Sequence, residues 1–401
     1  MIQIDGFINQ YVTKRAQSMF AEDIKLHEDA LKSGIGDRSV LVIGGAGSIG
    51  SSFIKAILPY GPSELYIVDT NENALTELTR DLRSGGYPVP DVYLSYPMDY
   101  HSEAFAHFFT AHKGFDIVAN FSAHKHVRSE KDIYAVEALL RNNVLHAKDL
   151  LDLLKEYRPE CYFCVSTDKA ANPVNIMGAS KRIMEDLIFS YSDVFRVKTA
   201  RFANVAFSNG SLPAGFLERL SKGQPLSAPS DVRRYFVSPE ESGQICMLAA
   251  ILGSNREIFF PKLAESQMTT FDKIAEDLLH AYGYEIVYCD SDEEAIEKAK
   301  QLREGSRAYP VHFSVSDTSG EKPFEEFYTA DETIDTDRFL SLGVITGKEK
   351  TEKEPLEKLL ATLDAYFEKA DRSKAGVVSI LSEYMPYFAH IESGRSLDSK
   401  M

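Results

Sequence analysis

The chain has 401 residues, enough for two lobes or for one large domain with an appendage, and 44% of them are hydrophobic, which allows a sizeable core. Its formal net charge of −16 disfavours nucleic acid as a partner, because phosphate backbones attract basic surfaces. No stretch approaches the ~18 consecutive apolar residues of a membrane span. Charged residues also interrupt the N-terminal segment, where a signal peptide would need an apolar core, so we expect a cytoplasmic protein.

Residues 1–38 are expected to form a helical extension. Apolar residues recur there at helical spacing in two patches, Ile4, Phe7, Ile8, Tyr11 and Val12, then Met19, Phe20 and Ile24. Gly34 and Gly36 end the pattern. We expect the extension to pack on the main body or on a neighbouring subunit.

From Val40 onward, strands and helices alternate. The expected strands are short apolar runs at 40–43, 65–68, 117–121 and 162–166, and a long helix is expected over 135–156. Such alternation is typical of a parallel sheet covered by helices. The predicted fold class is therefore α/β, with a Rossmann-type doubly wound parallel sheet over residues 39–200.

The pattern loosens after residue 201, where prolines divide the chain into short elements. Residues 201–350 are expected to form mainly a smaller, irregular substrate-binding lobe, with a charged helix over 290–303. Residues 351–401 are expected to form a C-terminal helical extension. No internal repeat is visible.

Two of the four cysteines, Cys161 and Cys164, form a CxxC pair that invites a metal or redox interpretation. The pair lies in an apolar run that predicts a buried strand, where residues three apart face opposite sides. No second CxxC or histidine pair completes a zinc site. The sequence therefore favours two buried cysteines and no metal.

The first chemical motif is a glycine-rich loop after the first strand. Gly44, Gly47 and Gly50 fit G-x-x-G-x-x-G, and the helix that follows presents free N–H groups to a pyrophosphate. Asp69 ends the next strand, where a carboxylate can accept the ribose hydroxyls of an adenosine. Because it would repel a 2′-phosphate, NAD is favoured over NADP. The alternative is a glycine turn that binds no ligand.

The second motif runs from Ser166 to Lys181. Its Thr167-Asp168-Lys169 lies at the carboxyl end of a predicted strand, the sheet edge where ligands bind in open α/β folds. Met177 and Lys181, four residues apart, share one face of the following helix. Without the glycine loop, a turn with a surface ion pair would explain the Thr-Asp-Lys triplet equally well.

With these motifs, the chain resembles the extended short-chain dehydrogenase/reductases, and within them the UDP-N-acetylglucosamine 4,6-dehydratase group. The resemblance covers roughly residues 39–260. Its carriers are GGAGSIGSS at 44–52, SAHKHVRSEKD at 122–132, STDKAANPVNIMGASKR at 166–182, RFANV at 201–205 and RRYF at 233–236.

The resemblance implies a nucleotide-sugar 4,6-dehydratase that uses NAD. A hydride leaves C4 of the hexose, water is eliminated across C5 and C6, and the hydride returns to C6. In this scheme Asp168 protonates the leaving C6 hydroxyl and Lys169 removes the C5 proton. Thr167 hydrogen-bonds the C4 oxygen, and Lys181 holds the nicotinamide ribose.

One position departs from the wider superfamily. Most members have Tyr-x-x-x-Lys, with the tyrosine as acid and base for the sugar hydroxyl, whereas this chain has Met177 there. A thioether cannot exchange a proton. Some members of the dehydratase group also carry methionine, so activity is still expected, but the base for the C4 hydroxyl is unassigned.

Further site residues follow from the same reading. The residues expected around the cofactor are Gly44, Gly47, Ser48, Ile49, Gly50, Asp69, Asp99, Ser122 and Lys181. Those expected around the substrate are Lys125, Asn204, Arg233 and Arg234, the two arginines being candidates for the diphosphate because guanidinium binds phosphate in a bidentate fashion. His124 and His126 are expected to pack beside Lys125 without a metal.

Several alternatives stay open. The same scaffold can carry a nucleotide-sugar 4-epimerase or a C5-inverting dehydratase, although an epimerase usually keeps the tyrosine. A non-catalytic NAD-binding regulator would have no reason to retain the Thr-Asp-Lys triplet with Lys181. The nucleotide can be UDP, which is preferred, or GDP. The resemblance also implies a homodimer or higher oligomer paired through the helices at 135–156 and 181–190.

Overall fold

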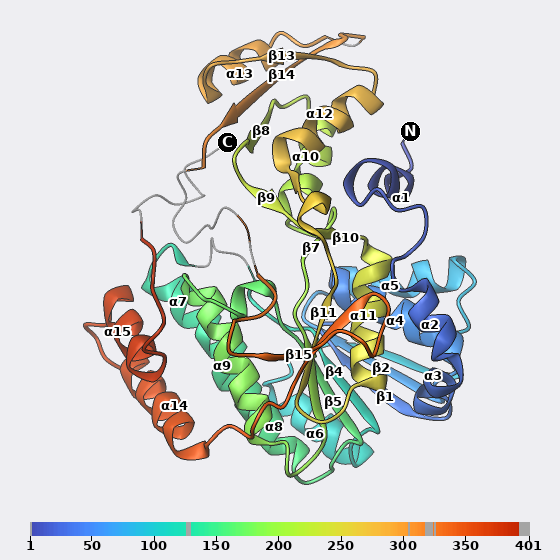
Figure 1. The fold of residues 1–401 in the computed structure, drawn as a ribbon, viewed down its shortest axis with the longest axis vertical. Coiled ribbons are helices and arrows are strands. Elements are labelled where there is room, and N and C mark those ends of the chain that lie inside the picture. The colour runs from blue at the N-terminus through green and yellow to red at the C-terminus, as the bar shows by residue number, and fades with distance from the viewer. Residues whose placement is uncertain (1, 126–129, 304, 317–323, 325, 393–401) are drawn as a thin grey trace.

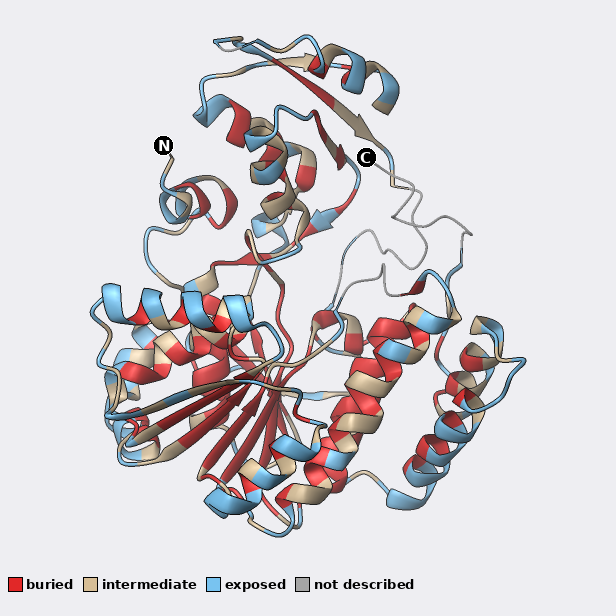
Figure 2. Cartoon of the chain, turned by 180° about the vertical axis from the view of Figure 1, so that it is seen from behind, coloured by how far each residue is buried: buried red, intermediate tan, exposed pale blue. Residues whose placement is uncertain are grey.

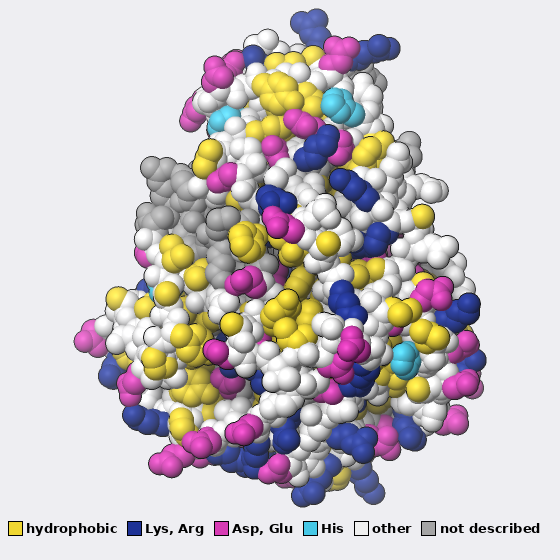
Figure 3. Space-filling model, in the orientation of Figure 1, with side chains coloured by type: hydrophobic (Ala, Val, Ile, Leu, Met, Phe, Trp, Pro, Cys, Tyr) yellow, Lys and Arg dark blue, Asp and Glu magenta, His cyan; other side chains and the backbone are white. Residues whose placement is uncertain are grey.

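The computed structural model describes residues 2–125, 130–303, 305–316, 324 and 326–392. A large sheet flanked by helices forms the lower part of the molecule in Figure 1, and a smaller lobe lies above it. On the face that Figure 3 shows, acidic and basic side chains of the described residues are interspersed. None of the described helices is long and apolar enough to cross a membrane.

The large sheet has nine strands in the order β15-β16-β11-β6-β5-β4-β1-β2-β3. Seven of them, from β11 to β3, are parallel, and β16 and β15 continue the sheet in antiparallel fashion. The bounds are β1 (Ser39–Ile43), β2 (Glu64–Asp69), β3 (Val92–Pro97), β4 (Ile117–Asn120), β5 (Cys161–Val165), β6 (Val197–Ala200), β11 (Glu257–Pro261), β15 (Thr333–Asp335) and β16 (Leu342–Thr346). The order 3-2-1-4-5-6 confirms the Rossmann-type fold.

Burial explains which strands the sequence reveals. β4, β5 and β6 are buried along their whole length, as expected for parallel strands covered on both faces (Figure 2). β4 and β5 are therefore nearly continuous apolar runs, whereas β6 contains Lys198 and Thr199 and its sequence does not mark it as a strand. The edge strand β3 exposes Val92 and Leu94 and lacks such a run, which is why the sequence pattern did not single it out.

Helices cover both faces of the sheet. Their bounds are α4 (Ser48–Ile57), α5 (Glu72–Ser84), α6 (Glu103–His112), α7 (Ile133–Leu140), α8 (His146–Leu154), α9 (Ile176–Ser190) and α11 (Pro239–Leu252). The helix predicted over 135–156 is α7 and α8 joined by a π-helical turn, Arg141–Leu145. The thiol of Cys161 meets Ala250 of α11 and that of Cys164 meets Met184 of α9. The two cysteines therefore face opposite sides of β5, as predicted, and each is buried and free.

The smaller lobe has its own core and a three-stranded parallel sheet, β13-β14-β8. Its elements are β7 (Asn204–Val205), α10 (Leu212–Ser221), β8 (Leu226–Pro229), β9 (Arg233–Arg234), β10 (Phe236–Val237), β12 (Thr269–Thr270), α12 (Phe271–Ala281), β13 (Glu285–Tyr288), α13 (Asp292–Ala299) and β14 (Ala308–Ser314). The helix predicted over 290–303 is the shorter α13.

The division between the two parts differs from the boundary expected at residue 200. β11, β15, β16 and α11 lie beyond that residue, yet they belong to the large sheet and its covering layer. Prolines at 239 and 261 bound α11 and β11, and they broke the periodic pattern from which the boundary was drawn.

The N-terminal segment contacts both parts. α1 (Ile4–Phe7) and a π-helical turn (Ile8–Val12) place Phe7, Ile8 and Val12 in the core of the smaller lobe. α2 (Ala21–Leu26) and α3 (Glu28–Ile35) place Phe20, Leu31 and Ile35 in the core of the large sheet. At the other end of the chain, α14 (Lys353–Phe367) and α15 (Lys374–Tyr384) form a hairpin beside α9 (Figure 1).

Candidate active site

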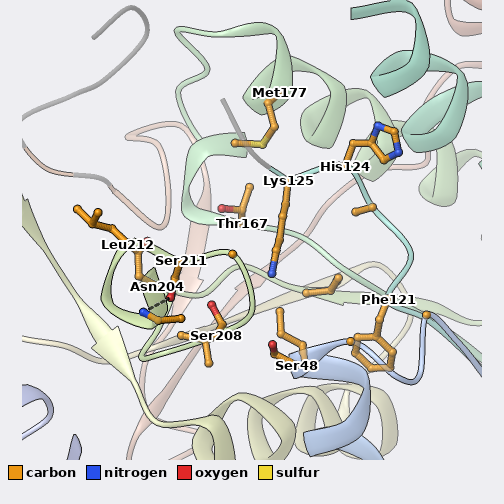
Figure 4. Close-up of a pocket in the computed structure, with 18 of the residues that line it drawn as sticks. Ser48, Phe121, His124, Lys125, Thr167, Met177, Asn204, Ser208, Ser211 and Leu212 are labelled. Atoms are coloured by element: carbon orange, nitrogen blue, oxygen red, sulfur yellow. Dashed lines mark hydrogen bonds between the residues drawn. The ribbon is translucent and has the colours of Figure 1, made fainter. Parts of the chain in front are cut away.

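A pocket of about 1090 Å³ lies between the carboxyl edge of the large sheet and the smaller lobe. The glycine loop and the ends of β2, β4 and β5 form one side, and residues of β7, α10, β8 and β14 form the other. Figure 4 shows Lys125 extending into the middle of this space, with Thr167 and Met177 toward one wall and Ser48 toward another. The position matches the crevice where open α/β sheets bind ligands.

The glycine loop packs too tightly for side chains. Gly44 has φ +71°, and a Cβ there would lie 2.6 Å from the backbone nitrogen of Ser122. A Cβ on Gly50 would lie 2.4 Å from the carbonyl oxygen of Gly44. The loop and the first residues of α4 line the pocket, in the position of an anion-binding loop.

Asp69 ends β2 and faces the same loop. One carboxylate oxygen accepts the backbone N–H of Ala46 at 3.0 Å, and the other accepts that of Asn71 at 2.9 Å. These bonds fix the carboxylate at the pocket wall. All residues expected around a cofactor line this pocket, namely Gly44, Gly47, Ser48, Ile49, Gly50, Asp69, Asp99, Ser122 and Lys181.

The Thr-Asp-Lys triplet follows β5 and opens a short 3-10 turn, Asp168–Ala170. The Thr167 hydroxyl donates to Asp168 Oδ1 at 2.8 Å, and Lys169 Nζ donates to the same oxygen at 3.2 Å. Thr167 and Lys169 line the pocket, whereas Asp168 is only 4% exposed and lies behind them. The carboxylate is thus connected to the pocket through its two neighbours.

Met177 and Lys181 project from the first turns of α9 into the same pocket. Asn175 caps the helix by accepting the N–H of Gly178 at 2.7 Å. The buried carboxylate of Glu130 accepts the N–H groups of Ile176 and Met177 at 3.0 and 2.9 Å. The first four backbone N–H groups of a helix have no acceptor within the helix, and in α9 side chains accept hydrogen bonds from three of them.

Lys181 is buried, and its ammonium donates to the carbonyl of Val165 at 3.1 Å. Desolvation lowers the pKa of Lys181 to about 8, Cys164 and Glu185 oppose the shift, and Lys125 adds to it. Lys125 itself points into the pocket, and desolvation by the pocket walls lowers its pKa as well. The site therefore holds two ammonium groups that lose their protons more readily than a surface lysine.

A buried ionic network supports this wall from behind. Ser166 donates to Glu185 at 2.6 Å, and the guanidinium of Arg201 binds both carboxylate oxygens of Glu185. Arg201 also binds both oxygens of Glu332. Although burial alone would raise it, hydrogen bonds from Arg201 and Lys348 hold the pKa of Glu332 at about 2. Sequence reasoning missed these carboxylates, and Arg201 directly after a buried strand was the available signal.

The residues expected around a substrate separate into two groups. Lys125, Asn204 and Arg234 line the pocket. Arg233 does not, because adjacent strand residues face opposite sides, and it pairs with Glu265 at 3.0 Å on the exposed side of β9. Arg219 of α10 lines the pocket instead, and no motif in the sequence marked it.

Of the two histidines in the SAHKHV motif, only the first lies within the described residues. His124 lines the pocket, where its backbone N–H donates to Asn143 and desolvation lowers its pKa. His126 lies outside the described residues. Within the described part of the chain, no group of three or more histidine, cysteine or acidic residues could hold a metal ion.

The chain has relatives among proteins of polysaccharide synthesis. A family model described as "Polysaccharide biosynthesis protein" matches residues 40–332. The probable polysaccharide biosynthesis protein EpsC of Bacillus subtilis (strain 168) is 27% identical over 312 residues, 76% of this chain and 50% of EpsC. The capsular polysaccharide biosynthesis protein CapD of Staphylococcus aureus is 26% identical over 298 residues, 73% of this chain and 48% of CapD. The chain thus spans about half the length of these two relatives.

A UDP-N-acetylglucosamine 4,6-dehydratase (inverting) of Campylobacter jejuni is 24% identical over 322 residues, 78% of this chain and 89% of that enzyme. Among solved structures, Pen from Bacillus thuringiensis aligns with a TM-score of 0.63 at 20% identity, covering 82% of this chain and 98% of Pen. DesIV, a dTDP-glucose 4,6-dehydratase from Streptomyces venezuelae solved with NAD and TYD, aligns with a TM-score of 0.54 at 19% identity. The alignment covers 72% of this chain and 88% of DesIV. The chain therefore belongs to the polysaccharide biosynthesis protein family of extended short-chain dehydrogenase/reductases, whose relatives include nucleotide-sugar dehydratases.

Proposed function

We propose that this chain is a nucleotide-sugar 4,6-dehydratase that binds NAD and acts on an N-acetylglucosamine nucleotide, with UDP the preferred nucleotide. The observation that carries the proposal is the grouping of Thr167, Lys169, Met177 and Lys181 on one wall of a pocket that opens onto the glycine loop. The Campylobacter jejuni relative with that named activity matches this chain over most of its own length.

The residues present fit NAD. Gly44 and Gly50 leave no room for a Cβ, so the loop backbone can approach a pyrophosphate, and Asp69 stands where the adenosine ribose hydroxyls would lie. The glycine loop, Asp69, Asp99 and Ser122 would hold the adenosine half, and Lys181 the nicotinamide ribose. When bound, NAD supplies the acceptor and donor of hydride.

The structure offers a base for the C4 hydroxyl despite Met177. Thr167 lines the pocket and donates to Asp168 Oδ1 at 2.8 Å. Thr167 Oγ can take the C4 hydroxyl proton while it passes its own proton to Asp168. The buried carboxylate then holds the proton, and Lys181 favours negative charge on the C4 oxygen.

The same groups can complete the elimination. Lys169 lines the pocket, and in its neutral amine form it can take the C5 proton, which the C4 ketone makes acidic. The C4 and C6 oxygens lie on carbons that flank C5, so one Thr167 hydroxyl can face both. The proton stored on Asp168 returns through Thr167 to the C6 hydroxyl, which leaves as water. Arg234 and Arg219 are the cations on the lobe side that would bind the diphosphate.

Mass spectrometry of the sugar nucleotide after incubation tests the proposal. The purified chain is incubated with NAD and either UDP- or GDP-N-acetylglucosamine, and loss of one water is expected with the UDP sugar. An unchanged mass together with a new diastereomer would identify a 4-epimerase instead. No change in mass or stereochemistry with either nucleotide would contradict both activities. The configuration at C5 of the product, read by NMR, separates the retaining from the inverting reaction.

A further inference from the structure

Helix α9 is buried on nearly every side. All of its residues except Arg182 and Asp186 are buried, including Ile183, Leu187 and Ile188. A helix that covers one face of a sheet normally keeps a polar, solvent-exposed stripe. α9 therefore has a second covering layer, on the side away from the sheet.

The C-terminal hairpin, α14 with α15, provides that layer. The apolar residues of α14 recur at helical spacing and join the core of the large sheet, as do two of α15: Leu356, Leu359, Leu360, Leu363 and Phe367, with Val377 and Leu381. α14 packs against α9 and against the π-helical turn between α7 and α8. Arg141 of that turn binds Asp364 and Glu368 at 3.1 and 3.0 Å and lies over the ring of Phe367.

The end of α15 contacts α9, and the segment after the hairpin reaches the start of α9, where the site residues are. The Tyr384 hydroxyl donates to Asp186 of α9 at 3.3 Å. The backbone N–H of Ile391 donates to the carbonyl of Val174 at 2.9 Å. His390 lies 3.7 Å from Glu130, the carboxylate that accepts the first N–H groups of α9.

We propose that the C-terminal hairpin acts as an in-chain partner for α9, in the place where the sequence predicted a second copy of the chain. It closes the apolar face of the α7–α9 layer and holds Met177 and Lys181 at the pocket wall, so this face makes no contact between copies. The hairpin residues that do so are positioning residues. The effect of this positioning on catalysis rests on the proposed dehydratase activity, whereas docking of the hairpin within one chain does not.

Cross-linking shows whether the hairpin docks within one chain. Tyr384→Cys and Asp186→Cys place two half-buried thiols where the side chains now meet, and the four native cysteines are buried. A short bismaleimide should link residues 186 and 384 in a species that runs as a monomer on a denaturing gel. A covalent dimer would overturn the proposal, as would labelling of both cysteines by N-ethylmaleimide without any cross-link. Each single-cysteine variant is the control.

Matched charge substitutions on α14 test the positioning role. Leu363 is fully buried in the core of the large sheet, and Ala361 on the same helix is exposed. Leu363→Asp should lower kcat by about tenfold or more with KM unchanged, because small displacements of catalytic groups are costly, and should weaken NADH binding seen by fluorescence. Ala361→Asp should change neither. Wild-type kcat and NADH affinity in a folded Leu363→Asp variant would refute the positioning role. If the chain has no dehydratase activity at all, the cross-link and NADH affinity still decide.

Discussion

At the residue scale, three hydrogen-bond donors meet at Asp168 Oδ1. The Thr167 hydroxyl, the Lys169 ammonium and the Lys169 backbone N–H all converge on this one oxygen. A carboxylate behind the pocket wall cannot reach a sugar directly, but it can store a proton for the two groups that do. In the proposed mechanism, a relay whose parts are adjacent in sequence thus takes the place of the tyrosine.

The relay and the C5 base can be separated by substitution. Lys169→Met removes the C5 base and leaves Thr167 and Asp168, so the C4 hydroxyl should still be oxidised. We expect absorbance of the reduced nicotinamide, no uptake of deuterium at C5 in heavy water, and turnover ~10²–10⁴-fold slower. Thr167→Val should produce neither the absorbance nor the exchange. Deuterium uptake in Lys169→Met would show that another group is the base.

In the proposed mechanism, the buried Lys181 makes activity depend on pH. Desolvation lowers the pKa of Lys181 from 10.5 to about 8, so the ammonium that favours negative charge at C4 is lost above that pH. We expect kcat/KM to fall on the alkaline side with an apparent pKa near 8. Because the folded pKa is lowered, the contribution of Lys181 to stability rises with pH between 8 and 10.5, so deprotonation of Lys181 does not itself unfold the chain. A flat kcat/KM from pH 7 to about 10 would contradict this role.

At the scale of elements, the correct predictions are those that rest on continuous apolar runs or on glycine spacing. Strands β1, β2, β4 and β5, the glycine loop and the triplet after β5 lie where predicted, whereas β6 was not predicted. The sequence pattern missed the edge strand β3 and placed the region of β11 in the smaller lobe, although β11 belongs to the large sheet. It also placed both Arg233 and Arg234 at the substrate, although the two side chains face opposite sides of β9. Each depends on long-range pairing or on strand register, which a local pattern does not specify.

The contact between the glycine loop and α4 supports an element-scale prediction. In Gly50→Ala the new Cβ would meet the Gly44 carbonyl at 2.4 Å, so the first turn of α4 must shift. We expect loss of NADH binding in fluorescence titration and a destabilisation of about 1–3 kcal/mol in urea unfolding. Gly6→Ala on α1 is the control, because no atom lies within 4 Å of its Cβ. Equal NADH affinity in the two variants would show that the loop tolerates the shift.

At the scale of the whole molecule, the N-terminal segment fastens the two parts that form the pocket. Its first turns lie in the core of the smaller lobe, and α2 and α3 lie against the large sheet. Between them, Arg15 binds both carboxylate oxygens of Glu241 at the start of α11, at 2.8 and 2.6 Å. Its guanidinium also donates to the carbonyl of Phe236 in β10 at 3.1 Å. One side chain thus joins the segment, the sheet layer and the lobe.

Removing this junction should weaken both stability and substrate binding. Arg15→Ala leaves the buried Glu241 without its ionic partner, and breaking a buried pair in this way costs about 3–5 kcal/mol. We expect a loss of that size in urea unfolding, and a raised KM for the sugar nucleotide because the pocket lies between the two parts. Lys32→Ala is the control, since Lys32 pairs with Glu28 on the surface of α3, and exposed pairs contribute at most about 1 kcal/mol. If Arg15→Ala and Lys32→Ala unfold at the same urea concentration, the N-terminal segment does not hold the two parts together.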